Sequence, residues 1–341
     1  MLELINPTQV SLKNILVATD FSQASLSALT CSLPIAKHFN SVIHIVHVTD
    51  PPQIDIASPA ANSTICQQAY MNAQLQLERL DTVVGTVPHR TWLRGGQVSK
   101  IVEDLVQSQH IDLVVVGASG KSGIKKFFLG SVAEEIVRKV PCPVLTVGPH
   151  ASPSACGGPL AQLLYVTRLW EESHYGLQYV IGLTVQCKSR LLLLHIVEQE
   201  EPKPSDHEWL KAYRRILRNL LPECAGELLV EPVLRVEVAK NPVARILQVA
   251  DELRADVIVM DVPREEPWAT HLRDKVYDLI SRASCPVLTV RTEMDEHSSE
   301  AEPLGIGAPA ELGSESRCLE LDSPVRRNIA IRTNKRTRWI P

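Results

Sequence analysis

The stretch DLVVVGASGKSGIKKFFLGSVAEEIVRKVPCPVLTV, residues 112–147, contains a strand, a glycine-rich loop, a helix and a second strand in succession. Asp112–Val116 is a near-continuous apolar run of strand length, and Val144–Val147 is another. Between them, Ser131–Lys139 has the apolar spacing of a helix. Short strands without polar alternation are typical of a parallel sheet that helices cover on both faces. The stretch therefore predicts an α/β fold.

The residues before this stretch continue the alternation of strands and helices. Ser22 is a candidate N-cap, Pro34 predicts a kink, and Pro51–Ser63 has the composition of a loop. The first half is thus predicted to form a doubly wound sheet of five parallel strands. The further strands are expected at Ile15–Thr19, Val42–Val48 and His89–Leu93, and the further helices at Ser22–His38, Thr64–Leu80 and Val98–Gln107.

An internal repeat extends this prediction to the second half. The sequence CPVLTV occurs at residues 142–147 and again at residues 285–290. The opening, second and fourth strands of the first half are also echoed, in the same order, by LLYVTR, LLLHIV and DVIVM. Four matching segments in one order indicate a duplicated domain. The fold class is therefore two tandem doubly wound five-stranded parallel sheets.

The repeat also sets the expected domain boundaries. We expect a first domain at residues 1–150, a linker at 151–160, a second domain at 161–291 and a disordered tail at 292–341. The two domains are expected to pack as an intramolecular pseudo-dimer, and a homodimer is also possible. Their fifth strands form the expected seam, because paired edge strands cover each other's exposed hydrogen-bonding groups.

Composition excludes several classes of protein. The chain has 341 residues, 45% of them hydrophobic, and a net charge of −4, so no global basic field indicates nucleic acid or a membrane surface as a partner. No apolar run is long enough for a membrane span, and the N-terminus lacks the pattern of a signal peptide, which predicts a cytoplasmic protein. The eight cysteines form no CxxC pair and are expected to be small buried hydrophobes in a reducing compartment. The basic end of the tail suits solvent, an acidic partner or RNA, and a solvated tail is the expectation.

The loop Gly117–Ser131 carries the chemistry that the sequence indicates. It follows a strand and leads into a helix, at the edge of a parallel sheet where ligands bind. Backbone N–H groups and a helix N-terminus at such a point favour a phosphate. Gly117, Gly120 and Gly130 lack a Cβ, so their backbone can approach an anion and adopt positive φ. The loop therefore predicts a phosphate-binding site.

Two better-known phosphate-binding motifs do not fit this loop. The sequence Gly120-Lys121-Ser122 is similar to the end of a Walker A loop, but that motif needs glycine where Val115 stands. No GxGxxG follows the first strand, so a dinucleotide site is not indicated.

The spacing G-x2-G-x9-G-S instead resembles the ATP-binding loop of the universal stress protein family. The sequence ATDFS at residues 18–22, the pair His47-Val48 and the sequence PCPVLTV at residues 141–147 match further patterns of that family. The resemblance covers residues 10–149 and continues in weaker form over residues 160–291. It implies a tandem universal stress protein with ATP, held with Mg²⁺, in the first domain.

The resemblance also implies a role for each matching residue. The ribose and adenine end would lie against Ala18, Thr19 and Asp20, with Val48 lining the adenine pocket through its backbone. Val116 and Gly117 would border the nucleotide. The phosphates would be held by Gly120, Gly130, Ser131 and Val132.

Each of these residues also has a structural interpretation. Ser131 and Glu134 form an S-x-x-E pattern, which is typical of a helix capping box. Asp20 is also suited to a turn, and a lysine on the loop is usually solvated. His44 and His47 are expected to be structural histidines rather than ligands.

The second half departs from the phosphate-binding pattern. Arg168 takes the place of Asp20, and the fourth strand leads into Asp261-Val262-Pro263 followed by Arg-Glu-Glu-Pro, without a glycine. Prolines remove backbone donors, and the carboxylates would repel a polyphosphate. The second domain is therefore predicted to keep the fold and to lack the nucleotide site.

These observations favour an ATP-binding stress-response module that regulates or contacts an unknown protein partner. The alternatives are a slow ATPase or autophosphorylating protein, and a scaffold that binds no nucleotide. No catalytic residue is identified, and the metal ligands stay unknown.

Overall fold

The structure is a computed structural model that describes residues 10–49, 59–118, 129–152, 160–167, 175–199, 206–221, 228–263 and 270–292. The first repeat contains β1 (Asn14–Ala18), α1 (Gln23–Phe39), β2 (Val42–Thr49), α2 (Pro59–Val84), β3 (His89–Gly95), α3 (Val98–Ser108), β4 (Leu113–Gly117), α4 (Ser131–Lys139) and β5 (Val144–Val147). The second repeat contains β6 (Gln162–Val166), α5 (Tyr175–Cys187), β7 (Arg190–Glu198), α6 (Asp206–Leu220), β8 (Val233–Ala239), α7 (Pro242–Leu253), β9 (Val257–Pro263), α8 (Thr270–Arg282) and β10 (Val287–Thr292).

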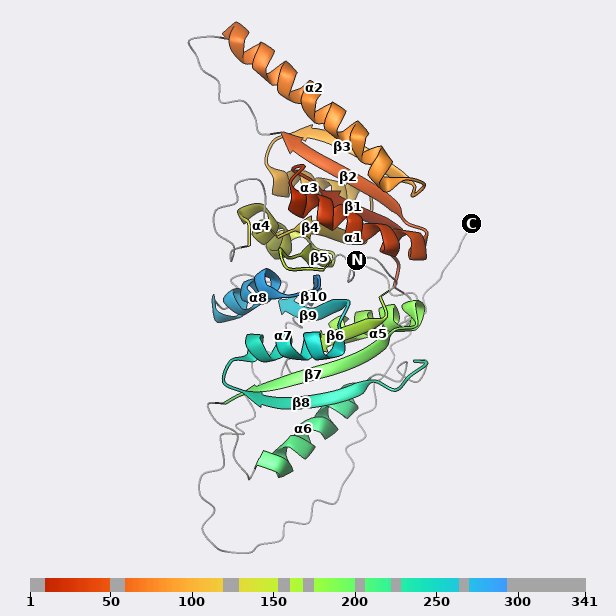
Figure 1. Ribbon diagram of the computed structural model, residues 1–341, viewed down its shortest axis with the longest axis vertical. Coiled ribbons are helices and arrows are strands. Elements are labelled where there is room, and N and C mark those ends of the chain that lie inside the picture. Colours follow the sequence, from red (N-terminus) through yellow and green to blue (C-terminus); the bar gives the residue numbers. More distant parts are fainter. Residues whose placement is uncertain are drawn as a thin grey trace, which may run out of the picture. The chain divides into compact units, whose positions relative to one another are not determined.

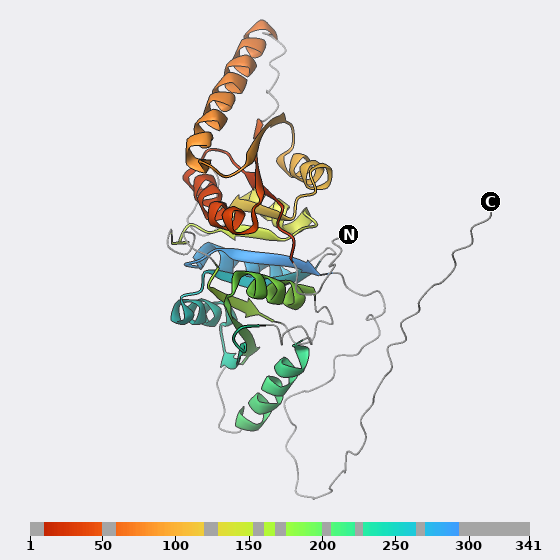
Figure 2. The same cartoon turned by 90° about the vertical axis from the view of Figure 1, so that its right-hand side faces the viewer.

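All ten strands belong to one sheet in the order β3-β2-β1-β4-β5-β10-β9-β6-β7-β8 (Figure 1). Within each repeat the strands are parallel and the order is the same. Helices cover both faces of the sheet (Figure 2). The predicted doubly wound fold is confirmed.

Alternate side chains of the central strands pack into two separate hydrophobic cores, one on each face of the sheet. Those strands therefore lack polar residues. Leu16, Val114 and Val116 pack on one face of the sheet with α3 and α4, whereas Val17 and Val115 pack on the other with α1. Burying each such side chain contributes about 1.5–3 kcal/mol. The fold is therefore specified mainly by apolar strands that are covered on both sides.

The two repeats meet through their fifth strands, as the sequence predicts. β5 and β10 are antiparallel, and Leu145 pairs with Leu288 at the centre of the pairing. Val144 pairs with Thr289, and Thr146 pairs with Val287. These pairs are reciprocal because CPVLTV occurs in both repeats, so the seam has the self-complementary form of a two-fold interface. The antiparallel pairing joins two parallel five-stranded sheets into one.

Equivalent hydrogen bonds hold the start of the first strand in each repeat. Asp112 Oδ2 accepts hydrogen bonds from the backbone N–H groups of Lys13 and Asn14, at 2.6 and 2.9 Å. Asp256 Oδ2 accepts the corresponding bonds from Ala161 and Gln162, at 2.7 and 2.8 Å. The duplication therefore extends from the strand order to individual hydrogen bonds.

The helices α1 and α2 and the residue Cys31 differ from the expectations in detail. α2 begins at Pro59, inside the segment expected to be a loop, because proline is favourable in the first turn of a helix. α1 continues past Pro34 to Phe39 and begins after the expected N-cap Ser22, whose Oγ accepts from the Ser25 N–H at 3.2 Å. Cys31 is disulfide-bonded, so the expectation that all cysteines are reduced is wrong for this residue.

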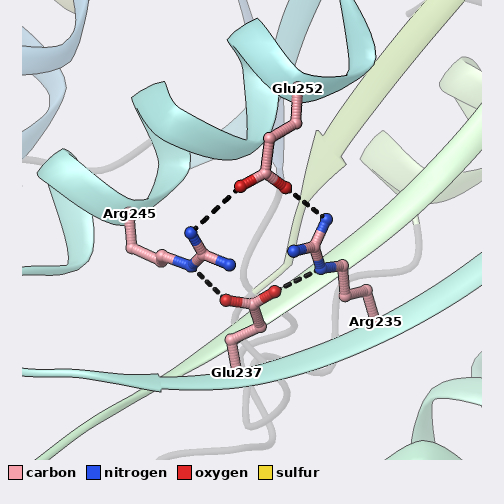
Figure 3. Close-up of polar contacts among 4 residues, drawn as sticks. All are labelled: Arg235, Glu237, Arg245 and Glu252. Atoms are coloured by element: carbon pink, nitrogen blue, oxygen red, sulfur yellow. Dashed lines mark hydrogen bonds and ion pairs between the residues drawn. The ribbon is translucent and has the colours of Figure 1, made fainter.

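The edge strand β8 is joined to α7 by a ring of four alternating charges (Figure 3). Arg235 Nη1 lies 2.9 Å from Glu252 Oε2, and Arg245 Nη1 lies 3.2 Å from Glu252 Oε1. Both arginines also contact the Glu237 carboxylate. Burial would raise the pKa of Glu237, but the Arg245 hydrogen bond and the Arg235 charge outweigh it and hold the pKa below its usual value.

Candidate functional site

The turn between β1 and α1 presents its polar groups at the carboxyl end of the sheet. Thr19 Oγ1 accepts a hydrogen bond from the Phe21 N–H at 3.0 Å, and Asp20 Oδ1 accepts from the Ser22 N–H at 2.9 Å. The turn interpretation of Asp20 is therefore confirmed. Asp20 also lines a cavity, so its turn contact does not remove it from the surface of the candidate site.

Phe21 holds an unusual backbone conformation beside that cavity. Its φ of 61° lies in the left-handed region, which is costly for a bulky residue. The hydrogen bond to Thr19 and a ring contact with His47, with 4.3 Å between centroids, hold it there. Such conformations cluster at binding sites.

The two histidines of β2 have structural partners, as expected. His47 Nδ1 donates to the Thr19 carbonyl at 2.7 Å, since a carbonyl only accepts, and this bond joins β2 to the β1–α1 turn. His44 is buried, lies 3.3 Å from Asn14 Oδ1 and accepts from Trp92 Nε1 at 3.3 Å. His47 lines the cavity and His44 does not.

The two ends of the glycine-rich loop meet at the carboxyl end of β4. The Gly130 N–H donates to the Ala118 carbonyl at 2.7 Å, and the Ala118 N–H donates to the Val147 carbonyl at 2.9 Å. Residues 119–128, which include Gly120 and the three lysines, lie outside the described part of the chain. The hydrogen bond between Ala118 and Gly130 nevertheless shows that the loop returns to its starting point.

The first turn of α4 presents backbone donors to the same point. Gly130 is the N-cap, and its carbonyl accepts from the Glu134 N–H at 2.9 Å. The capping-box interpretation of Ser131 is therefore wrong, because Ser131 is the first helical residue. The N–H groups of Ser131, Val132 and Ala133 have no acceptor within the helix and lie at the positive end of its dipole. An anion is favoured there.

Glycine is needed at position 117 for packing rather than for positive φ. A Cβ there would lie 2.6 Å from the carbonyl carbon of Ala24 in α1. Among the described glycines only Gly85 and Gly96 have positive φ, and Gly130 has φ −62°. The expectation of positive φ is thus wrong for Gly117 and Gly130.

These elements surround a cavity of about 680 Å³, within the range of about 300–1,000 Å³ common for small-molecule sites. Its lining is partly apolar, from the strand ends, and partly polar, from the turn and α4. Of the ten residues that the sequence singles out, the structure brings nine to this cavity; Gly120 lies outside the described residues. The nine are Ala18, Thr19, Asp20, Val48, Val116, Gly117, Gly130, Ser131 and Val132.

One wall of the cavity was missed by the sequence analysis. The helix α2 lines it with Ala69, Asn72, Ala73 and Gln76. These four residues have the spacing of one helix face. That spacing was visible in the sequence, but nothing in it indicated that this face lies over the carboxyl ends of β1 and β2. Phe21, Ser25 and His47 were missed as lining residues for the same reason.

Larger side chains stand at equivalent positions of the second repeat. Asp261 of β9 takes the place of Gly117 of β4, and its carboxylate lies against the Cα of Gly176, in the space that a Cβ there would need. Tyr165 donates its hydroxyl hydrogen to Asp261 Oδ2. His195 Nδ1 donates to the Thr167 carbonyl at 3.0 Å, as His47 does to Thr19, and its ring stacks on Tyr213 of α6 at 5.3 Å. Arg168 lies outside the described residues.

Among the residues that the structure describes, no group of three or more His, Cys, Asp or Glu side chains is arranged to hold a metal ion. No described helix has the length and apolar character required to cross a membrane.

Comparison with known proteins gives the family. The model of the universal stress protein family matches residues 11–148 and again residues 162–291. The chain belongs to the universal stress protein family. This tandem member is 31% identical, over 139 residues, to a universal stress protein of Methanocaldococcus jannaschii; the match covers 40% of this chain and 81% of the relative.

Solved structures of universal stress proteins show the same fold. One from Archaeoglobus fulgidus has a TM-score of 0.60 and 18% identity, and the match covers 82% of this chain and 98% of that one. A universal stress protein solved in complex with cAMP is 25% identical with a TM-score of 0.30, and the match covers 40% of this chain and 97% of that one.

Proposed function

We propose that the first repeat of this universal stress protein binds ATP together with Mg²⁺ and that nucleotide occupancy regulates contact with a protein partner in a stress response. The observation that carries the proposal is the cavity, which combines the carboxyl ends of three parallel strands with the N-terminus of α4. The apolar strand ends suit a base, and the N–H groups of α4 that have no acceptor within the helix suit phosphates.

The residues fit the proposed ligand in charge as well as in size. Asp20 is the carboxylate that lines the cavity, and it lies in the turn after β1, a strand that is two strands from β5. The start of α4 supplies backbone hydrogen-bond donors. Its first three residues, Ser131, Val132 and Ala133, carry no carboxylate that would repel a phosphate. Mg²⁺ is usually held by phosphates and few protein oxygens, so the ion would bind through the nucleotide.

We propose further that the second repeat binds no nucleotide and that residues 1–150 form the nucleotide-binding domain. This proposal is supported by Asp261 and Tyr165, which occupy the space beside Gly176. The second repeat would then act as the fixed partner of the first across the seam. A ligand that binds one arrangement of the pair better would shift the population towards it.

The variant Gly130→Val tests the nucleotide site. Valine is compatible with the extended backbone at this position, so the helix should form, while the added side chain stands among the proposed phosphate contacts. We expect ATP binding, measured by isothermal titration calorimetry, to be abolished while the circular dichroism spectrum stays unchanged. Undiminished ATP affinity in a folded Gly130→Val protein would refute the site. Gly117→Val is unsuitable, because the clash with Ala24 would disturb the fold itself.

A further inference from the structure

We infer that Asn72 and Gln76 on α2 determine base specificity, by hydrogen bonding to the edge of the nucleotide base and favouring adenine over guanine. This inference rests on the proposed function of the first repeat, and it assigns a role to a wall that the glycine-rich loop does not include. The α2 wall would decide which base is accepted, whereas the glycine-rich loop would bind the phosphates.

The shape of the α2 wall is the first observation. Ala69 and Ala73 alternate with Asn72 and Gln76 along the cavity face of the helix. The two alanines leave room in the cavity, and the two amides supply hydrogen-bonding groups beside that room. In the part of the chain that the structure describes, neither amide has a protein hydrogen-bond partner. Gln74, by contrast, lies on the solvent side and donates to Glu78 Oε1 at 3.3 Å.

The position of α2 places this wall at the base end of the cavity. α2 packs beside β2, β3 and α1, whereas α4 packs beside α3 and β5. β1 and β4 lie between β2 and β5 in the sheet. With phosphates at the N-terminus of α4, the opposite end of the nucleotide therefore lies near β2 and α2.

The second repeat provides a comparison for this wall. α6 joins the second and third strands of its repeat, as α2 does in the first. The face of α6 beside His195 presents the Tyr213 ring, which stacks on the imidazole with an interplanar angle of 14°. The corresponding His47 faces the cavity, which Ala73 and Gln76 line. Small and amide residues thus occur on the helix that borders a cavity, and an aromatic residue occurs on the corresponding helix of the second repeat, where it covers the histidine.

The chemistry of a carboxamide favours adenine. On the edge of adenine that carries N6 and N7, its carbonyl accepts from the amino group and its NH₂ group donates to N7. Guanine presents two acceptors, O6 and N7, on that edge, which leaves the amide oxygen unpaired. A pair of amides held at one helix spacing can be satisfied by one base and left unpaired by the other, which is a strong source of discrimination.

The test replaces both amides by apolar groups of similar size, in Asn72→Leu/Gln76→Met, with Gln74→Met as the matched control. Dissociation constants for ATP, GTP and inorganic tripolyphosphate are measured by calorimetry on the full chain. We expect the wild type and Gln74→Met to prefer ATP over GTP by about 10- to 100-fold. The double variant should lose this preference and bind ATP correspondingly more weakly, with tripolyphosphate binding unchanged.

Two outcomes would overturn the inference while leaving the proposed function intact. One is equal binding of ATP and GTP by the wild type, and the other is an unchanged ATP preference in the double variant. Absence of binding of ATP, GTP and tripolyphosphate to the wild type would instead overturn the proposed function, and this inference with it.

Discussion

Near the carboxyl ends of β4 and β9, the same scaffold carries a glycine in one repeat and an aspartate in the other. In the first repeat Gly117 has no side chain and faces Ala24; in the second, Asp261 has a carboxylate and faces Gly176. The larger side chain of each pair therefore stands on the helix in the first repeat and on the strand in the second. This exchange keeps the helix and sheet closely packed while placing a negative charge where a phosphate-binding strand end would be.

The comparison separates what the fold needs from what the cavity needs. Contacts common to both repeats, such as the bonds of His47 and His195 to the preceding turn, hold the architecture. Other features differ between the repeats, such as Gly130 before α4 and Tyr213 on α6. On the proposed function, the duplicated chain keeps its architecture in both halves and its ligand in one.

The largest expected effect is on the feature that both repeats share equally, the seam. Leu145→Ala and Leu288→Ala should each lower the free energy of unfolding by about 2–5 kcal/mol, because both side chains are buried opposite each other. The double variant should lose less than the sum of the two, since the partners are in contact. Urea denaturation measures all three. Fully additive losses would show that the two leucines do not act as a pair.

The next prediction makes the first repeat resemble the second. Ala73→Tyr places a tyrosine on the cavity side of α2, as Tyr213 stands on α6, and should weaken ATP binding by about 100-fold, equivalent to about 2.7 kcal/mol. The control Tyr213→Ala should leave ATP affinity unchanged. Fluorescence titration measures both. If Ala73→Tyr binds ATP like the wild type, α2 does not border the nucleotide.

A smaller effect is expected at the ring of charges that only the second repeat has. Glu237→Gln should lower the free energy of unfolding by about 1–3 kcal/mol, because both arginines lose a mostly buried charged partner. Glu135→Gln in the first repeat removes a carboxylate from an exposed pair with Lys139 and should cost less than about 1 kcal/mol. Chemical denaturation compares the two. Equal costs would contradict a special role for the ring.

The smallest predicted effect concerns pH. Burial lowers the pKa of His44, and the charge of Arg90 adds to this. The unfolded chain therefore binds the proton at higher pH, so this contribution to stability is complete above about pH 6.5 and is lost as the pH falls below it. His44→Leu, which copies Leu192 of the second repeat, should reduce the loss of Tm between pH 7.5 and 5.5 by about 2 °C.

The exposed His150 provides the control for this pH dependence. His150→Leu should leave the difference in Tm between the two pH values as it is in the wild type. An identical acid-induced loss in His44→Leu and the wild type would contradict the assignment to His44.

The sequence predicts the strands and the seam well because their signal is local and repeated. Ser131–Lys139 and Val144–Val147 have the expected bounds, since an apolar pattern with a glycine before it and a proline after it defines them. The start of α2 at Pro59 was missed, because a proline- and serine-rich composition suits a loop as well as the first turn of a helix.

The sequence predicts only the part of the cavity whose residues are placed by the strand order. Residues at strand ends and at the start of α4 are placed by the topology alone, so Asp20 and Gly130 could be identified from the sequence. Asn72 and Gln76 could not, because their position depends on the angle at which α2 crosses the sheet. The stacking of Tyr213 on His195 in the second repeat depends on the same kind of tertiary packing.

The stoichiometry of ATP binding to the full chain tests the central comparison most directly. In calorimetry with Mg²⁺ present, the account predicts one ATP per chain, lost in Gly130→Val and kept in Tyr213→Ala. A value of two would show that the second repeat also binds nucleotide, and one site that survives Gly130→Val in a folded protein would refute the assigned site. Either result would contradict the account.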